Sequence, residues 1–137
     1  MLLRGSYILI ITLYEEQTIK VGGLQNIHFP RGHYAYVGSA MGGFKPRLSH
    51  HSRRDKRPRW HIDYLLQKAH INDIILCEAE ERTECIIARA LSFQFDSIPG
   101  FGCSDCKCRS HLFYAADEEQ MKLVVTAIVN LLIVQRH

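Results

Sequence analysis

Apolar residues along the chain fall into short runs that predict strands alternating with helices. The longest strand-like run, residues 6–14 (SYILIITLY), is almost continuously apolar and rich in isoleucine. Such a run is typical of a central strand that is covered on both faces. Clusters of turn residues separate it from further short strands. These are expected at 18–21, 25–29, 34–37, 74–79 and 111–115, the last of them at a sheet edge.

Residues repeated at three- and four-residue spacing predict helices. One begins near Pro46, because proline is tolerated in the first turn of a helix. Others are expected at 60–69, at 83–95 and after Asp117, whose side chain can cap the helix that follows. This order predicts a single α/β (α+β) domain over residues 1–137, with a small mixed β-sheet flanked by helices.

The composition supports a globular domain in water. The chain has 137 residues, 47% of them hydrophobic and 23% charged, which is enough for a core that folds unaided. Its longest apolar stretch, from Leu123 to Val134, is shorter than the roughly 20 residues that cross a bilayer, and we interpret it as a buried helix. The chain does not open on a secretory signal, so we expect a cytoplasmic protein with no membrane partner.

Positive charge is concentrated in one segment. Seven of the seventeen lysines and arginines lie between Lys45 and Arg59, where only Asp55 opposes them. The segment is either a solvated basic loop or a surface for a polyanion, with nucleic acid the favoured partner. On its helix, Arg47, His50 and His51 share one face at helical spacing. The expected nucleic-acid contacts are Lys45, His50, Arg53, Arg54, Lys56, Arg57 and Arg59.

A second cluster of candidate ligands lies near the C-terminus. The chain has five cysteines, and three of them follow one another closely. Thiolate and imidazole are the ligands that Zn²⁺ prefers, so Cys103, Cys106, Cys108 and His111 could close a tetrahedral site. The intervals are not those of common zinc fingers, and a thiol-rich loop packed beside a cleft is the alternative.

Glu84 is the candidate ligand for a harder cation. It is in line with Ala88, Leu91 and Phe95 on the predicted helix, so it should point back toward the sheet. A carboxylate in that position is costly unless it is paired or metal-bound. One carboxylate with water-rich coordination suits Mg²⁺, whereas the alternative role is to complement the helix dipole.

Several motifs resemble those of the GIY-YIG nuclease superfamily. Gly5-Ser6-Tyr7 and Tyr36-Val37-Gly38 resemble its paired tripeptides, although a hairpin-sized insertion separates them and Ser6 replaces an isoleucine. Arg47, His51 and Glu84 resemble its arginine, histidine and metal-binding glutamate, with His50 the other candidate for the histidine. More narrowly, YAYVGSAMGG, WHIDYLL, GFGCSDCKC and SHLFY are similar to the DUF123 branch, an uncharacterised prokaryotic domain that is sometimes fused to a base-excision glycosylase.

The resemblance implies a metal-dependent DNA endonuclease that hydrolyses phosphodiester bonds in repair or recombination, on branched or damaged DNA. It implies that Tyr7 or Tyr36 activates or positions the attacking water, and that Mg²⁺ or Mn²⁺ binds at Glu84. A tyrosine, with an ordinary pKa near 10, is a poor base unless a cation such as Arg47 or a metal lowers that pKa. The catalytic residues implied are Tyr7, Tyr36, Arg47, His51 and Glu84. The departures from the motifs keep open a second hypothesis, a nucleic-acid-binding accessory module that has lost catalysis, with or without a structural zinc.

Overall fold

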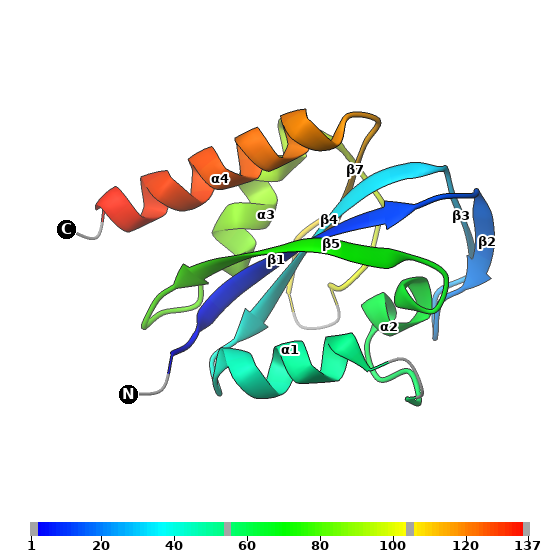
Figure 1. Ribbon diagram of the computed structural model, residues 1–137, viewed down its shortest axis with the longest axis horizontal. Helices are drawn as coiled ribbons and strands as arrows, with labels where there is room; N and C mark the ends of the chain where they lie inside the picture. Colours follow the sequence, from blue (N-terminus) through cyan, green and yellow to red (C-terminus); the bar gives the residue numbers. More distant parts are fainter. Residues whose placement is uncertain (1–2, 54–55, 104–105, 136–137) are drawn as a thin grey trace.

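The computed structural model describes residues 3–53, 56–103 and 106–135, and its main element is a five-stranded antiparallel sheet. The strand order is β5-β1-β4-β7-β6, so the most apolar strand lies inside the sheet. A separate β2–β3 hairpin extends from one end (Figure 1). The strands are β1 (Gly5–Leu13), β2 (Gln17–Lys20), β3 (Asn26–Phe29), β4 (Gly32–Ala40), β5 (His70–Glu78), β6 (Asp96–Ser97) and β7 (Leu112–Ala115).

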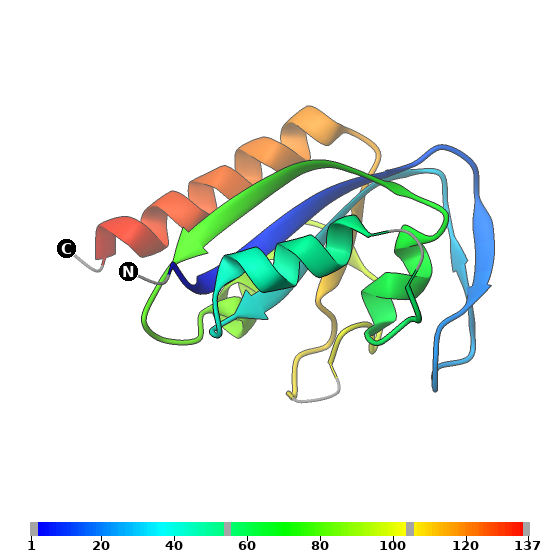
Figure 2. The same cartoon turned by 60° about the horizontal axis from the view of Figure 1, so that its bottom comes forward.

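Helices cover both faces of this sheet (Figures 1 and 2). They are α1 (Phe44–Ser52), α2 (His61–Leu66), α3 (Glu84–Ser92) and α4 (Glu118–Gln135). Along β1, Tyr7 and Leu9 point to the core under α1, α2 and the hairpin, whereas Ile8 and Ile10 point to the core under α3 and α4. This alternation explains why every residue of β1 is buried.

The register between β1 and β4 sets the positions of the two tyrosine motifs. Tyr7 lies opposite Gly38, and Leu9 lies opposite Tyr36. Because Tyr7, Leu9 and Tyr36 belong to the same core, both phenols lie on the sheet face that α1 and α2 cover. The two ring centroids are 6.4 Å apart.

The predicted α+β fold is confirmed, and three details differ from expectation. Every strand pair in the described residues is antiparallel, where a mixed sheet was expected. The last strand, β7, lies between β4 and β6 and not at the edge, because the two residues Asp96–Ser97 pair with it and take the edge. The helix α4 buries only one side: Met121 and Val125 are inside, but Leu123 is exposed.

Candidate functional site

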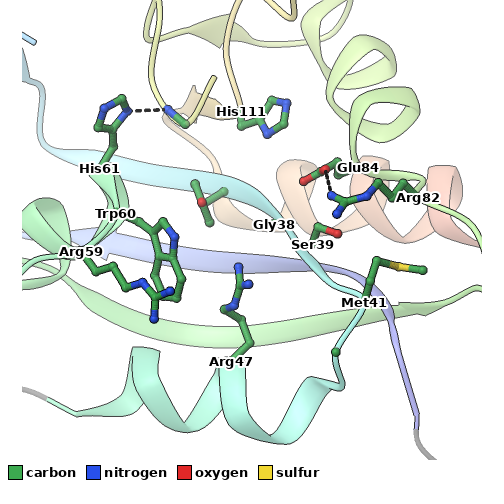
Figure 3. A pocket seen from close by; sticks show the side chains of 13 residues that line it. Gly38, Ser39, Met41, Arg47, Arg59, Trp60, His61, Arg82, Glu84 and His111 are labelled. Atoms are coloured by element: carbon green, nitrogen blue, oxygen red, sulfur yellow. Dashed lines mark hydrogen bonds and ion pairs between the residues drawn. The ribbon is translucent and has the colours of Figure 1, made fainter. Parts of the chain in front are cut away.

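A cavity of about 340 Å³ opens beside the ends of α1 and α3, next to β4 (Figure 3). Three of the residues predicted to be catalytic line it, and they come from three different elements: Tyr36 from β4, Arg47 from α1 and Glu84 from α3. Arg59 and His111, which belonged to other predicted groups, also line it. The cavity, hereafter the pocket, therefore collects side chains that are far apart in the sequence.

Tyr7 lies directly beneath the pocket wall rather than in it. Its side chain is fully buried, and its ring and hydroxyl pack against the Cα of Gly38, a residue that lines the pocket. A Cβ at position 38 would overlap the Tyr7 hydroxyl, so glycine is required by close approach. The glycine of the second tripeptide thus makes room for the tyrosine of the first.

The Tyr7 hydroxyl is hydrogen-bonded to His51. Its oxygen lies 2.6 Å from Nε2 of the His51 ring, which is itself buried. Burial raises the pKa of Tyr7 to about 12 despite the lowering effect of Arg47, and burial lowers the pKa of His51 to about 4. At neutral pH the phenol is therefore protonated and the imidazole neutral. Arg47 does act to lower the pKa of Tyr7, but desolvation outweighs its effect.

Asp63 organises the residues behind this pair. Its buried carboxylate lies 3.1 Å from Nε2 of His50 and 3.3 Å from Nζ of Lys56. It also accepts hydrogen bonds from the backbone N–H groups of Arg59 and Trp60, and these interactions lower its pKa against the effect of burial. These two bonds fix the start of α2, since they satisfy N–H groups that a helix terminus leaves unpaired.

The same carboxylate favours one tautomer of His51. Oδ1 of Asp63 is 4.0 Å from Nδ1 of His51, and Nδ1 has no hydrogen-bond partner among the described residues. A proton on Nδ1 faces the carboxylate, which leaves Nε2 to accept the hydrogen bond from Tyr7. The geometry thus gives the Tyr7 hydroxyl a neutral hydrogen-bond acceptor within the protein.

Two guanidinium groups gather around Trp60 at the edge of the pocket. The guanidinium carbon of Arg47 lies 4.3 Å from the centroid of the Trp60 ring, and that of Arg59 lies 4.8 Å from it. Figure 3 shows Arg47 reaching from α1 toward the pocket, with Trp60 and Arg59 beside it. Cation–π contacts of this kind hold a guanidinium in place while its N–H groups stay available to an anion.

Glu84 lies at the first turn of α3, where the helical pattern predicted it. Its carboxylate is 3.4 Å from a guanidinium nitrogen of Arg82, which is largely exposed. Ser39 lines the same pocket, and its buried hydroxyl has no hydrogen-bond partner within the described part of the chain. The pocket thus offers a carboxylate and an unsatisfied hydroxyl oxygen.

The predicted nucleic-acid contacts fall into two groups. Arg59 lines the pocket, and the exposed side chains are those of Lys45, Arg53, Arg57 and Arg59. His50 and Lys56 are instead directed to Asp63, and Lys56 also donates to the His50 carbonyl at 2.6 Å. The charge of Lys56 is thus compensated inside the protein. Arg54 lies outside the described residues.

The cysteine-rich loop forms a cluster that could hold a metal ion. Ligand atoms of Cys85, Cys106, Cys108 and His111 all lie within 4.8 Å of one another. Nε2 of His111 is 3.4 Å from Sγ of Cys106 and 3.9 Å from Sγ of Cys85. We name these four residues the Cys₃His cluster. Cys85 takes the place expected for Cys103, whose thiol instead donates to the Phe101 carbonyl at 3.4 Å.

Two important residues were missed or misplaced by the sequence argument. Cys85 was overlooked as a ligand because it precedes the other cysteines by a whole helix and strand. The one indication in the sequence was its neighbour Glu84. Because Glu84 was a predicted site residue, the Cys85 thiol beside it could have been expected to lie near the site. Asp63 could be placed at the beginning of a helix, but its four partners come from a loop and another helix that periodicity does not locate.

Comparison with known proteins identifies the family of the chain. Over residues 6–134 it matches the family described as domain of unknown function DUF123, which covers nearly all of the sequence. No curated protein and no solved structure gave a match to it. Within the described residues, none of the helices is both long and apolar enough to span a membrane. By the extent of the family match, the chain belongs to the DUF123 family.

Proposed function

We propose that this protein is a metal-dependent endonuclease that hydrolyses phosphodiester bonds in DNA at the pocket. The observation that carries the proposal is that Tyr36, Arg47 and Glu84 line one cavity although they come from β4, α1 and α3. A phenol, a guanidinium and a carboxylate together provide the groups that phosphodiester hydrolysis needs. The resemblance of the tyrosine motifs to those of GIY-YIG nucleases supports the same assignment.

Arg47 and Arg59 are the proposed phosphate contacts. Both guanidinium groups stack on Trp60, and both residues line the pocket. A planar guanidinium can bind two phosphate oxygens at once, which a lysine cannot. The exposed side chains of Lys45, Arg53 and Arg57 extend this positive surface and would contact the DNA backbone further from the scissile bond.

Tyr36 is proposed to position the attacking water. In hydrolysis the water oxygen forms a bond to phosphorus while the bond to the leaving oxygen breaks, and one proton must be accepted. Tyr36, which lines the pocket, would orient the water. Tyr7, held beneath the pocket wall by its 2.6 Å hydrogen bond to His51, would support this arrangement. The proton of the water would pass to solvent in the pocket, because burial raises the pKa of Tyr7 to about 12 and lowers that of His51 to about 4. The leaving oxygen then takes a proton from solvent.

Glu84 is the proposed ligand for Mg²⁺ or Mn²⁺. These ions prefer oxygen ligands and keep several waters, so one carboxylate with the unpaired Ser39 hydroxyl fits them. When bound, the ion would neutralise charge on the phosphate. The ion would compete with Arg82 for the Glu84 carboxylate, because these side chains form an ion pair at 3.4 Å.

For the Cys₃His cluster we propose Zn²⁺. Three thiolates and one imidazole are a ligand set of structural zinc sites, and the spacing of the four atoms is compatible with it. We expect the protein to act in the cytoplasm, where thiols stay reduced and available to a metal. Branched or damaged DNA is the proposed substrate, and cooperation with a base-excision glycosylase would fit a role in repair.

The test is a cleavage assay with end-labelled single-stranded, duplex, flap and junction DNA, with Mg²⁺ or Mn²⁺. We expect cleavage by the parent protein and a loss of about 100-fold or more in Tyr36→Phe, Arg47→Ala and Glu84→Gln. Arg89→Ala is the matched control, because Arg89 is exposed at the last turn of α3, at the opposite end from Glu84. No cleavage of any substrate with either metal would overturn the proposal.

A nucleic-acid-binding module without catalysis is the second candidate. It is favoured by the Arg82–Glu84 ion pair, which occupies the carboxylate, and by the high tyrosine pKa values. This candidate predicts salt-dependent DNA binding that Arg47→Ala weakens and Glu84→Gln leaves unchanged, with no cleavage. Binding titrations run beside the cleavage assay separate the two functions.

A further inference from the structure

We infer that a metal ion at the Cys₃His cluster acts as a positioning centre for the pocket. It would fasten the first turn of α3, which carries Glu84, to the loop before β7, which lines the same pocket with Gly102 and His111. The inference rests on the proposed zinc site and deepens the proposed function, because it assigns a structural task to an ion that does not touch the substrate.

The spacing of the four ligand atoms is close to that of a tetrahedral site. In a tetrahedral site with Zn–S bonds of about 2.3 Å, neighbouring ligand atoms lie roughly 3.5–3.8 Å apart. The His111–Cys106 and His111–Cys85 distances, 3.4 and 3.9 Å, are close to this spacing, and no pair in the cluster exceeds 4.8 Å. Small side-chain rotations are enough to enclose an ion.

The backbone of the histidine ligand is held by β4. His111 is buried and its cluster contacts are made through Nε2. Its carbonyl accepts a hydrogen bond at 2.9 Å from the backbone N–H of Val37, the residue between Tyr36 and Gly38. The cluster is therefore connected to the strand that carries the pocket tyrosine.

The cluster adjoins the pocket on two sides. Cys85 follows Glu84 directly in the first turn of α3, so a bond from its thiolate limits the movement of the carboxylate. On the other side, His111 itself lines the pocket, and a Cβ on Gly102 would lie only 3.1 Å from the His111 Cβ. A shift of His111 would therefore displace the Gly102 backbone.

A hydrogen bond connects this loop to the arginine side of the pocket. The Gly102 N–H donates to Nδ1 of His61 at 2.8 Å. Figure 3 draws this bond as the dashed line at His61. His61 directly follows Trp60, which holds the guanidinium groups of Arg47 and Arg59. Loss of the ion should therefore change the surroundings of Trp60, although none of the four metal ligands contacts this residue.

Four protein ligands complete a tetrahedral shell and leave no open position for water or substrate. The ion is therefore structural. Cd²⁺ or Co²⁺ at the cluster should support the same pocket, because they accept the same ligands in the same geometry. At Glu84, by contrast, exchange of the oxygen-preferring ion should change the proposed reaction directly.

The experiment compares Cys85→Ser with the matched control Cys103→Ser, whose thiol lies beside Cys106 but is not one of the four ligands. For the parent protein and the control, we expect about one zinc per chain by elemental analysis, and thiolate-to-Co²⁺ absorption bands after cobalt exchange. Cys85→Ser should lose both and unfold at a temperature lower by about 5 °C or more. Zinc retained by Cys85→Ser, or lost from Cys103→Ser, would overturn the inference.

The positioning role has its own readout, because Trp60 is the only tryptophan in the chain. We expect a shift of its emission when a chelator removes the ion from the parent protein, and recovery when Zn²⁺ is added back. This measurement needs neither a variant nor nuclease activity. Unchanged emission after verified zinc loss would overturn the positioning role. If the fluorescence responds and no DNA is cut, the endonuclease proposal fails alone.

Discussion

The hydroxyl oxygen of Tyr7 and Nε2 of His51 lie 2.6 Å apart, although 44 positions separate the two residues in the sequence. The bond joins β1 to the last turn of α1 in a place closed to water. It pairs a phenol whose pKa is raised to about 12 with an imidazole whose pKa is lowered to about 4, both mainly through burial. We therefore expect this contact to affect both the free energy of unfolding and its dependence on pH.

Replacing Tyr7 by phenylalanine should lower the free energy of unfolding by about 1–3 kcal/mol. The substitution leaves Nε2 of His51 buried without its partner, and an unsatisfied buried polar group costs that much. Urea unfolding followed by circular dichroism measures the change. Tyr14→Phe is the control: Tyr14 is 62% exposed, so its effect should stay within about 0.5 kcal/mol. Equal losses in both variants would contradict the prediction.

Stability should fall as the pH decreases from about 6.5 to about 4. In this range the unfolded chain protonates His51 and the folded chain does not, because the pKa is lowered from 6.5 to about 4. The loss from this residue is at most about 3 kcal/mol. Charged neighbours on α1 and the following loop, Arg47 and Lys56, add to the lowering, whereas Asp63 opposes it.

His51→Asn tests the origin of this pH dependence, because asparagine does not titrate. His61 and His111 also have pKa values lowered by burial, so part of the slope should remain in the variant. The informative quantity is the difference between the two unfolding curves across this pH range, measured in urea. A variant with the same slope as the parent protein would show that His51 is not the source.

Gly38→Ala should be strongly destabilising, by about 2 kcal/mol or more, because the new methyl group overlaps the ring and hydroxyl of Tyr7. Gly23→Ala is the matched control, since a Cβ there meets no atom within 4 Å in the described structure. The penalty should shrink in a Tyr7→Leu background, which removes the overlapping atoms. Thermal unfolding of the parent protein, Gly38→Ala, Tyr7→Leu and the double variant gives a double-mutant cycle. Additive effects of the two substitutions would argue against direct contact.

Asp63→Asn should cost about 3 kcal/mol, as expected for removing one partner from a buried charge pair. The carboxylate is fully enclosed, and the substitution removes the negative charge opposite Lys56 and replaces one of the two acceptor oxygens by an NH₂ donor. Asp96→Asn, on an exposed side chain of the short edge strand, is the control and should change little. Unfolding in guanidinium chloride gives the free energies of unfolding of both variants. A loss below about 1 kcal/mol in Asp63→Asn would indicate that water replaces the carboxylate.

Local sequence patterns predicted the elements of this fold well and their partners less well. Burial of β1 on both faces requires a continuous apolar run, and burial of α3 on one side requires apolar residues at helical spacing. Both patterns can be recognised in the local sequence. The Asp96–Ser97 strand has no such pattern. These two polar residues pair with β7 only because the chain after α3 passes beside that strand. The path of the chain is a property of the tertiary fold.

The candidate site shows the same division. Tyr36, Arg47 and Glu84 were singled out one by one from the resemblance to nuclease motifs, and helical spacing indicated only the directions of the Arg47 and Glu84 side chains. Their common pocket depends on how three elements pack, which no local pattern encodes. The same reason explains Cys85: ligand spacing within one loop suggested Cys103, whereas the fold brings a thiol from another helix to the cluster.

The pairing of Tyr7 with Gly38 has a consequence for how errors in folding affect this molecule. Neighbouring residues of β1 face opposite sides of the sheet, so a slip of one position would exchange Tyr7 for Ser6 or Ile8 beneath the pocket. It would also set a phenol among the aliphatic side chains under α4. A mispaired chain thus loses its packing and its proposed chemistry together, and quality control that senses exposed apolar surface would remove inactive copies as well.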